Sequence, residues 1–286
     1  MNEPLRLLCV HAHPDDEASK GAPTVAKYAD EGIPATLVCC TGGEAGSILN
    51  PKMDRPDVRD NLHRVRMEEL AKSTALIGYE RVDLLGYRDS GMPDTAENEH
   101  PDNFANAPLD EAVERLVRII RRDRPQVIIT YPDDQRGYQH PDHLKVHDVS
   151  VPAFTRAGDP SWYPEAGELW APLKLYFSVW SRRRMLATHH KMLELGLESP
   201  FDERWFEHPD QDHRITTHID IGDYFEVRLD ALLAHATQVD PDSPFWFGVP
   251  REFGREVHPY DDYILAESRV STELPETDLF AGVPGR

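Results

Sequence analysis

The apolar and polar positions of the chain follow two recurring patterns. Short apolar runs bounded by turn residues predict buried strands, and longer segments with apolar residues three and four positions apart predict helices. Strands are expected at residues 5–10, 35–40, 82–85, 126–131, 173–180 and 215–221. Helices are expected at residues 23–30, 57–78, 109–122, 185–197 and 224–235.

The order of these elements predicts the fold class. Strand and helix alternate with short connections through about residue 156, which is typical of a parallel sheet with helices on both faces. We therefore predict an α/β protein with a Rossmann-like, mostly parallel sheet. The composition changes at residues 161–172, which are rich in Trp, Pro and Glu. We expect a single domain over 1–286, made of a core at 1–156 and a C-terminal α+β elaboration at 157–286.

The composition and net charge of the chain exclude several classes of function. With 40% hydrophobic and 29% charged residues the chain is a typical globular protein, and its formal net charge of −20 argues against nucleic acid or an anionic membrane as a partner. Cys9, Cys39 and Cys40 lie on or beside predicted strands and are expected to be reduced core residues. Residues 1–4 carry no signal-peptide pattern, and no apolar run is long enough to span a membrane. We expect a cytoplasmic protein that acts on a small molecule; its oligomeric state is not predicted.

Two histidine-rich segments each follow a predicted strand. His11-Ala12-His13-Pro14-Asp15-Asp16-Glu17 follows the first strand, and His140-Pro141-Asp142-His143 follows the strand at 126–131. Open α/β sheets hold their ligands at the carboxyl ends of strands. Imidazoles and carboxylates that meet at such an edge suit a divalent metal such as zinc. One isolated His or Asp would more often be a helix cap or a loop residue, so the pair of segments carries the prediction.

Other strand-end loops offer further polar groups. The loop at 41–46 is rich in glycine, but it lacks the lysine of a phosphate-binding loop and carries the acidic Glu44. A neutral polyol is therefore a better ligand for it than a phosphate. A Rossmann-type oxidoreductase is excluded in practice, because the first strand-to-helix turn has no Gly-x-Gly-x-x-Gly pattern.

The two histidine segments together resemble the LmbE/PIG-L family of zinc-dependent amidohydrolases. The resemblance implies one Zn²⁺ per chain, with Fe²⁺ as an alternative, bound by His13, Asp16 and His143. It also implies Asp15 as the general base and His140 as the group that stabilises the oxyanion. Asp142 would orient His140 and favour its protonated form. Tyr138 is a further candidate for oxyanion contact, although a rim aromatic is about as good an interpretation.

Several segments resemble the branch of this family that acts on glucosamine-inositol compounds. There Glu44, Arg66 and Asp89 would bind sugar hydroxyls, and Lys20 would meet a polar part of a cysteinyl group. The alternative for Arg66 is a surface ion pair with Glu68 or Glu69. Segments at 46–51, 235–241 and 275–283 extend the resemblance along the chain, whereas residues 200–213 fit it poorly.

The implied reaction is hydrolysis of the amide that joins an S-conjugated N-acetylcysteine to glucosamine-inositol in mycothiol S-conjugates. This reaction releases a mercapturic acid and serves detoxification. The rival functions are N-acetylglucosaminyl-inositol deacetylation in mycothiol biosynthesis and an antibiotic-pathway amidase of the same family. A non-catalytic sugar-binding protein is a more distant rival, because it would need no base beside a metal.

Some residues imitate metal ligands. His208 to His213 copies chelate spacing without a strand before it, and we expect a surface loop there. The pair His189-His190 and the lone His147 are expected to be solvated or packed. Cys40, near the end of its strand, is a weak candidate for a thiolate ligand.

Overall fold

The computed structural model describes residues 3–135, 137–207 and 210–286. Its strands form one seven-stranded sheet in the order β3-β2-β1-β4-β5-β7-β6. The five strands from β3 to β5 are parallel to one another, whereas β7 pairs antiparallel with both β5 and β6. The strands are β1 (Leu7–His11), β2 (Ala35–Thr41), β3 (Arg81–Tyr87), β4 (Val127–Thr130), β5 (Lys174–Val179), β6 (Thr217–Asp220) and β7 (Tyr260–Ser268). The predicted mostly parallel α/β sheet is confirmed.

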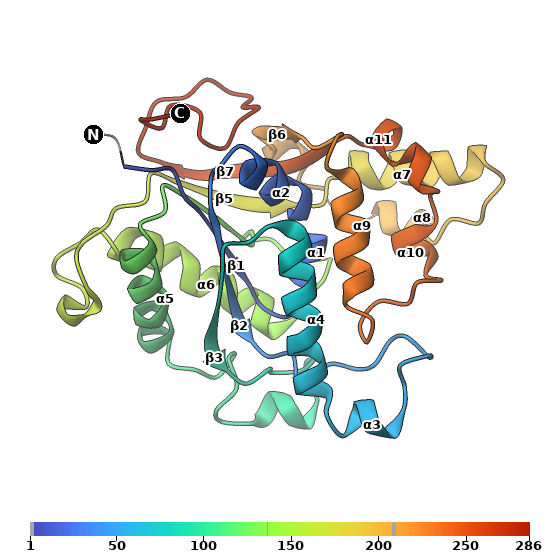
Figure 1. Ribbon diagram of the computed structural model, residues 1–286, viewed down its shortest axis with the longest axis horizontal. Coiled ribbons are helices and arrows are strands. Elements are labelled where there is room, and N and C mark those ends of the chain that lie inside the picture. Colours follow the sequence, from blue (N-terminus) through green and yellow to red (C-terminus); the bar gives the residue numbers. More distant parts are fainter. Residues whose placement is uncertain (1–2, 136, 208–209) are drawn as a thin grey trace.

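Helices cover both faces of the sheet (Figure 1). One face carries α2 (Ala22–Asp30), α4 (Leu62–Ile77) and α9 (Phe225–Ala234), and the other carries α5 (Leu109–Asp123) and α6 (Pro141–Arg156). The remaining helices are α1 (Asp16–Ser19), α3 (Pro56–Arg59), α7 (Arg182–Glu194), α8 (Glu203–Glu207), α10 (Pro244–Phe247) and α11 (Gly254–Val257), with 3₁₀ turns at Ala96–Glu99, Pro164–Ala166, Asp212–Arg214 and Arg251–Phe253. Helices α7, α8, α10 and α11 lie together beyond α9 at one end of the molecule (Figure 1).

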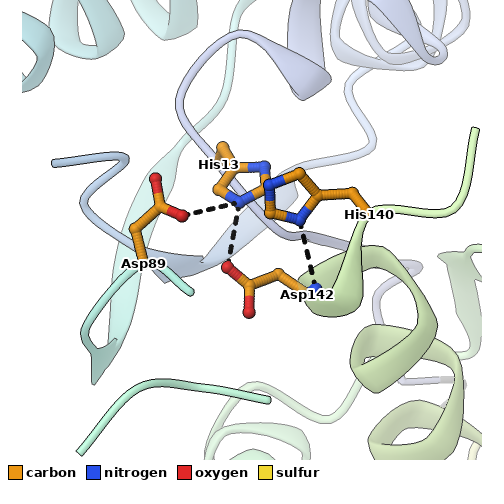
Figure 2. Close-up of side chains that lie close together, drawn as sticks. All are labelled: His13, Asp89, His140 and Asp142. Atoms are coloured by element: carbon orange, nitrogen blue, oxygen red, sulfur yellow. Dashed lines mark hydrogen bonds and ion pairs between the residues drawn. The ribbon is translucent and has the colours of Figure 1, made fainter. Parts of the chain in front are cut away.

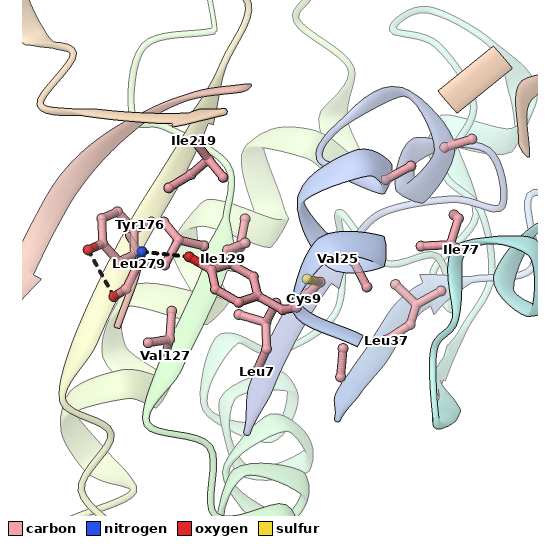
Figure 3. Close-up of a cluster of buried hydrophobic side chains, with 14 of the residues drawn as sticks. Leu7, Cys9, Val25, Leu37, Ile77, Val127, Ile129, Tyr176, Ile219 and Leu279 are labelled. Carbon is pink, nitrogen blue, oxygen red and sulfur yellow. Dashed lines mark hydrogen bonds between the residues drawn. The ribbon is translucent and has the colours of Figure 1, made fainter. Parts of the chain in front are cut away.

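Strand β1 shows why the apolar runs become buried strands. Successive side chains of a strand point to opposite faces, so Leu7 and Cys9 enter the core beneath α2, α4 and α9 (Figure 3). Leu8 and Val10 enter the second core, beneath α5 and α6. A strand with a core on each side has no polar face, and this is why its sequence shows no alternation.

Two expectations about the elements need correction. The predicted helix at 57–78 is divided into α3 and α4, because the backbone of Asn61 leaves the helical region at φ −129°. Strand β7 was not predicted at all, although it joins β5 to β6 within the sheet. Its sequence begins with Tyr260, Asp261 and Asp262, and two adjacent aspartates are not typical of a strand. Both are buried here because Asp261 pairs with Arg228 and Asp262 pairs with His218, and these partners are brought together only by the fold.

None of the described helices is both long and apolar enough to cross a membrane.

Candidate metal centre and active-site cavity

Strands β1 and β4 bring the two histidine segments together. The strands are paired in register from Leu7 opposite Val127 to Cys9 opposite Ile129, so their carboxyl ends lie at the same edge of the sheet. The chain turns sharply after β1 at Asp15, whose φ of 113° lies in the left-handed region, and α1 begins at the next residue. The backbone N–H of Asp15 donates to the Glu17 carboxylate at 2.9 Å, which stabilises this strained turn.

His13, Asp16 and His143 converge on one point. Asp16 Oδ2 lies 3.5 Å from His13 Nδ1 and 3.3 Å from His143 Nε2. One ligand atom from each of the three residues lies within 4.8 Å of the others, and all three residues are buried. Two imidazoles and one carboxylate are the donor set of a catalytic zinc site with an open coordination position.

The other ring nitrogen of His13 faces two more carboxylates (Figure 2). Its Nε2 lies 3.1 Å from Asp142 Oδ2 and 3.6 Å from Asp89 Oδ1. Burial favours the neutral ring, but hydrogen bonds to Asp142, Asp16 and Asp89 outweigh it and raise the pKa of His13. Three buried carboxylates around one imidazole leave an excess of negative charge that a divalent cation would neutralise, so the residues present fit a metal ion.

The position of Asp142 differs from the expectation. Its carboxylate contacts His13 and accepts hydrogen bonds from the Ser90 hydroxyl and, at 2.9 Å, from the Ser90 backbone N–H. Asp142 contacts His140 through its backbone, whose N–H donates to His140 Nδ1 at 3.2 Å (Figure 2). The reason is that His140 caps α6 while Asp142 lies in the first turn, so the Asp142 side chain points toward β1. The carboxylate therefore orients a candidate metal-binding histidine, an arrangement that is common around metal sites.

His140 is held in one tautomer. Because its Nδ1 accepts the N–H of Asp142, a neutral ring carries its proton on Nε2. Burial and the neighbouring His13 lower the pKa of His140, whereas the charge of Asp142 acts in the opposite direction and favours the protonated ring. The two rings meet edge to face with centroids 4.5 Å apart.

Asp15 lies beside the metal cluster, and Arg66 holds its side chain. Arg66, from the buried side of α4, donates to Asp15 Oδ2 at 3.1 Å and to the Pro14 carbonyl at 2.6 Å, and it also donates to the Gly43 carbonyl. It is not paired with Glu68 or Glu69; Glu68 pairs with Arg64. Burial raises the pKa of Asp15 to about 6, against the opposing charge of Arg66. A carboxyl with this pKa can exchange protons near neutral pH.

The remaining predicted residues differ in how they contact this centre. The ammonium of Lys20 pairs with Asp16, and Asp89 accepts hydrogen bonds from the backbone of Gly91 and Ala45. Tyr138 is 55% exposed on the rim, and its ring centroid lies 5.1 Å from that of His143. Glu44 is not among the residues that line the cavity, and one of its carboxylate oxygens is buried with no hydrogen-bond partner among the described residues.

The other His and Cys residues that were considered as possible ligands do not belong to the metal-binding groups among the described residues. Within the described part of the chain, no cysteine belongs to a metal-binding group, and the Cys40 thiol is buried in the core beneath α5 and α6. His147 Nδ1 contacts the Tyr131 carbonyl, and His189 Nδ1 contacts the Ser199 hydroxyl. The side chain of His213 is exposed, while His208 and Pro209 lie outside the described residues.

Sequence reasoning missed three residues that support the site. Ser90 holds Asp142, Glu17 holds the turn at Asp15, and His235 contacts Glu17. Glu17 belongs to the same segment as the candidate ligands His13 and Asp16, so its position was a signal. His235 lies in a segment that extends the resemblance and Ser90 follows Asp89, but neither pattern indicates a contact with Asp142 or Glu17, because only the fold brings these residues together.

The metal cluster lies in a cavity of about 740 Å³. One part of its lining is polar and includes Asp15, Asp16, Lys20, Arg66 and Asp89. Another part is apolar and comes from the C-terminal half, with Trp180, Met185, Trp205, Phe245 and Trp246. The cavity therefore suits a ligand with a polar and an apolar part.

The fold and this site define an α/β protein with a candidate metal-binding cluster at the carboxyl edge of a parallel sheet. Residues 8–154 match the family described as PIG-L, GlcNAc-PI de-N-acetylase. The chain belongs to this family.

Two relatives are similar to the whole chain. A mycothiol S-conjugate amidase from Streptomyces coelicolor is 47% identical over 292 residues, with 99% of each chain covered. A 1D-myo-inositol 2-acetamido-2-deoxy-alpha-D-glucopyranoside deacetylase from Geodermatophilus obscurus is 38% identical over 293 residues, with 98% of each covered.

Solved structures share the fold at low sequence identity. The N,N'-diacetylchitobiose deacetylase from Pyrococcus horikoshii has a TM-score of 0.62 at 18% identity, covering 90% of this chain and 82% of its own. GalB, the 4-carboxy-2-hydroxymuconate hydratase from Pseudomonas putida, has a TM-score of 0.58 at 17% identity, covering 94% and 99%. A deacetylase and a hydratase share this fold, so the fold alone does not decide the reaction.

Proposed function

We propose that this enzyme hydrolyses the amide bond between the S-conjugated N-acetylcysteine and the glucosamine-inositol part of mycothiol S-conjugates. The products are a mercapturic acid and glucosaminyl-inositol, and the reaction serves detoxification. The 47% identity to the Streptomyces coelicolor amidase over the whole chain supports this substrate. The observation that carries the proposal is the cavity, whose volume and apolar side exceed what an acetyl group needs.

The metal is proposed to be zinc, held by His13, Asp16 and His143. Their donor set and close convergence suit zinc, and Asp142 would hold His13 in the ligating orientation. Bound zinc would polarise the amide carbonyl and lower the pKa of the attacking water. Elemental analysis of the isolated enzyme would distinguish zinc from other divalent ions such as Fe²⁺.

Asp15 is proposed as the general base. Its carboxylate removes a proton from the water as the water oxygen bonds to the amide carbon. It then passes that proton to the glucosamine nitrogen, and the carbon–nitrogen bond breaks. The pKa of about 6 leaves Asp15 ionised at neutral pH and able to give the proton back. Arg66 keeps the carboxylate directed at the site.

His140 is proposed to stabilise the oxyanion that forms on the carbonyl oxygen. Its Nδ1 already accepts a backbone N–H, so the Nε2–H is the group that remains to donate. Tyr138, on the rim beside His140 and His143, is proposed as a second donor.

The polar side of the cavity is proposed to hold glucosamine-inositol. Asp89 lines this side, and Lys20 lies beside Asp16 where the cysteinyl amide would pass. Arg66 is proposed to act mainly through Asp15, because its terminal nitrogens already donate to three acceptors. Glu44 would reach a sugar hydroxyl only if its buried carboxylate turned toward the cavity.

The second candidate is deacetylation of N-acetylglucosaminyl-inositol, which the 38% identity to the deacetylase from Geodermatophilus obscurus supports. The chemistry is the same, but the acyl product is acetate. The two reactions therefore differ only in the size of the acyl group that the pocket must hold. An antibiotic-pathway amidase would use the same pocket for one specific conjugate.

The test is to compare kcat/KM of the zinc-loaded enzyme for a mycothiol S-conjugate and for N-acetylglucosaminyl-inositol. We expect at least about a tenfold preference for the conjugate, equivalent to about 1.4 kcal/mol of transition-state binding. Elemental analysis of the enzyme as isolated, before any metal is added, identifies the native ion. The reverse preference would assign the enzyme to biosynthesis, and turnover of neither substrate would contradict both assignments.

A further inference from the structure

The apolar side of the cavity is an organised group of rings. This aromatic wall consists of Trp180, Trp205, Phe245 and Trp246. Trp180 and Phe245 are stacked, with centroids 5.7 Å apart and planes inclined by 12°. Trp246 meets both rings edge to face, at 4.8 Å from Phe245 and 5.6 Å from Trp180. All four residues lie outside the segment 8–154 that matches the family model.

The sheet places this wall next to the metal cluster. Trp180 immediately follows β5, and β5 pairs in parallel with β4, whose end leads to His140 and His143. Phe245 and Trp246 lie on α10, and both rings pack against Trp180. One cavity thus joins the reacting centre directly to the rings.

We propose that the aromatic wall binds the substituent on the substrate's sulfur and selects planar, apolar substituents. This inference rests on the proposed function. In an S-conjugate, only the α- and β-carbons of the cysteine separate the sulfur from the reacting carbonyl. If the sugar occupies the polar side, the sulfur substituent therefore points toward the wall. Aromatic rings bind planar apolar groups by offset stacking and edge-to-face contact.

A second cavity shares part of its lining with the wall. Its volume is about 70 Å³, and Trp180, Met185, Leu232, Phe245 and Trp246 line both cavities. The wall is thus a single layer of side chains. Met185 is flexible, and Phe245 is only half-buried, so rotation of either side chain would join the two spaces. The enzyme then accepts substituents of different sizes while it still favours apolar ones.

An acetyl group has no atoms that extend to the wall. Substitutions in the wall are therefore expected to change the turnover of conjugates with large substituents and to leave smaller substrates unaffected. This difference separates a binding role of the wall from a purely structural role, which would lower all activities together.

The experiment compares kcat/KM for the S-naphthylmethyl and S-methyl conjugates of mycothiol. We expect wild type to favour the naphthylmethyl conjugate, and Phe245→Ala to reduce kcat/KM for it by about tenfold with little change for the methyl conjugate. Trp205→Ala, at a position that is 41% exposed, tests the wall with little risk to folding. The matched control is Trp162→Ala, because Trp162 is 36% exposed and lines neither cavity.

Equal losses for both conjugates, or an unchanged ratio in Phe245→Ala and Trp205→Ala, would overturn the proposal. If wild type hydrolyses no conjugate, the proposed function fails, and binding still tests the wall. N-acetyl-S-(naphthylmethyl)cysteine should then quench the tryptophan fluorescence of wild type and of the Trp162→Ala control with the same Kd, and should bind Phe245→Ala with a weaker Kd. Equal Kd values for wild type and Phe245→Ala would reject the wall as a binding surface.

Discussion

His235 and Glu17 are in direct contact although 218 positions separate them in the chain. His235 Nε2 lies 2.5 Å from Glu17 Oε1, and both side chains are fully buried. Burial disfavours both charges, but their mutual attraction raises the pKa of His235 and lowers that of Glu17. Since the other Glu17 oxygen accepts the N–H of Asp15, this pair connects α9 to the turn that carries the proposed base.

His235→Ala is expected to lower the free energy of unfolding by about 3–5 kcal/mol, because it leaves the Glu17 carboxylate buried without its cation. Adding Glu17→Gln removes that charge and should recover part of the loss. Urea unfolding of the two single variants and the double variant measures the coupling. Additive effects of the two substitutions would show that the contact contributes little to stability.

Asp15→Ala is expected to retain the metal and to lower kcat by about two to four orders of magnitude, the usual contribution of a general base. The measurements are steady-state kinetics and the metal content of the same preparation. Loss of metal in this variant would make Asp15 a ligand instead. His143→Ala provides the contrast, because it should release the metal.

Asp142→Asn is expected to weaken metal binding by about 10–100-fold, because it replaces the carboxylate that orients His13. Competition with a chelator measures the change in affinity. Asp148→Asn is the matched control, since Asp148 lies on the same helix and is exposed to solvent. An equal metal affinity of both variants would contradict this role for Asp142.

The pH at which kcat/KM falls on the acid side should depend on Arg66. Only the ionised Asp15 accepts a proton, so kcat/KM falls as the pH drops through the pKa of this carboxyl. The positive charge of Arg66 lowers that pKa, and Arg66→Met should therefore raise the pH of this fall by about one unit or more. Arg66→Lys keeps the charge and should leave the pH of this fall near its wild-type value. A downward shift in Arg66→Met would exclude Asp15 as the titrating base.

Much of the site could be predicted because its parts are local. The segments at His13 and His143 each follow a short apolar strand, and parallel strands end at a common edge. The contact made by the Asp142 carboxylate could not be predicted in this way. Spacing in the sequence places Asp142 near His140, but the side chain at the start of α6 points across the sheet to His13.

The sequence by itself predicted the strand and helix order of the first half, the parallel sheet and the two histidine segments at one sheet edge, and the resemblance to a known family implied His13, Asp16 and His143 within them. These features depend on periodicity and on short segments that follow the ends of predicted strands. The tertiary structure decided the insertion of β7 beside β5, the contact between Glu17 and His235, and the aromatic wall. These features join residues that are far apart in the chain, and their pairing depends on shape and charge complementarity that appears only after the chain has packed.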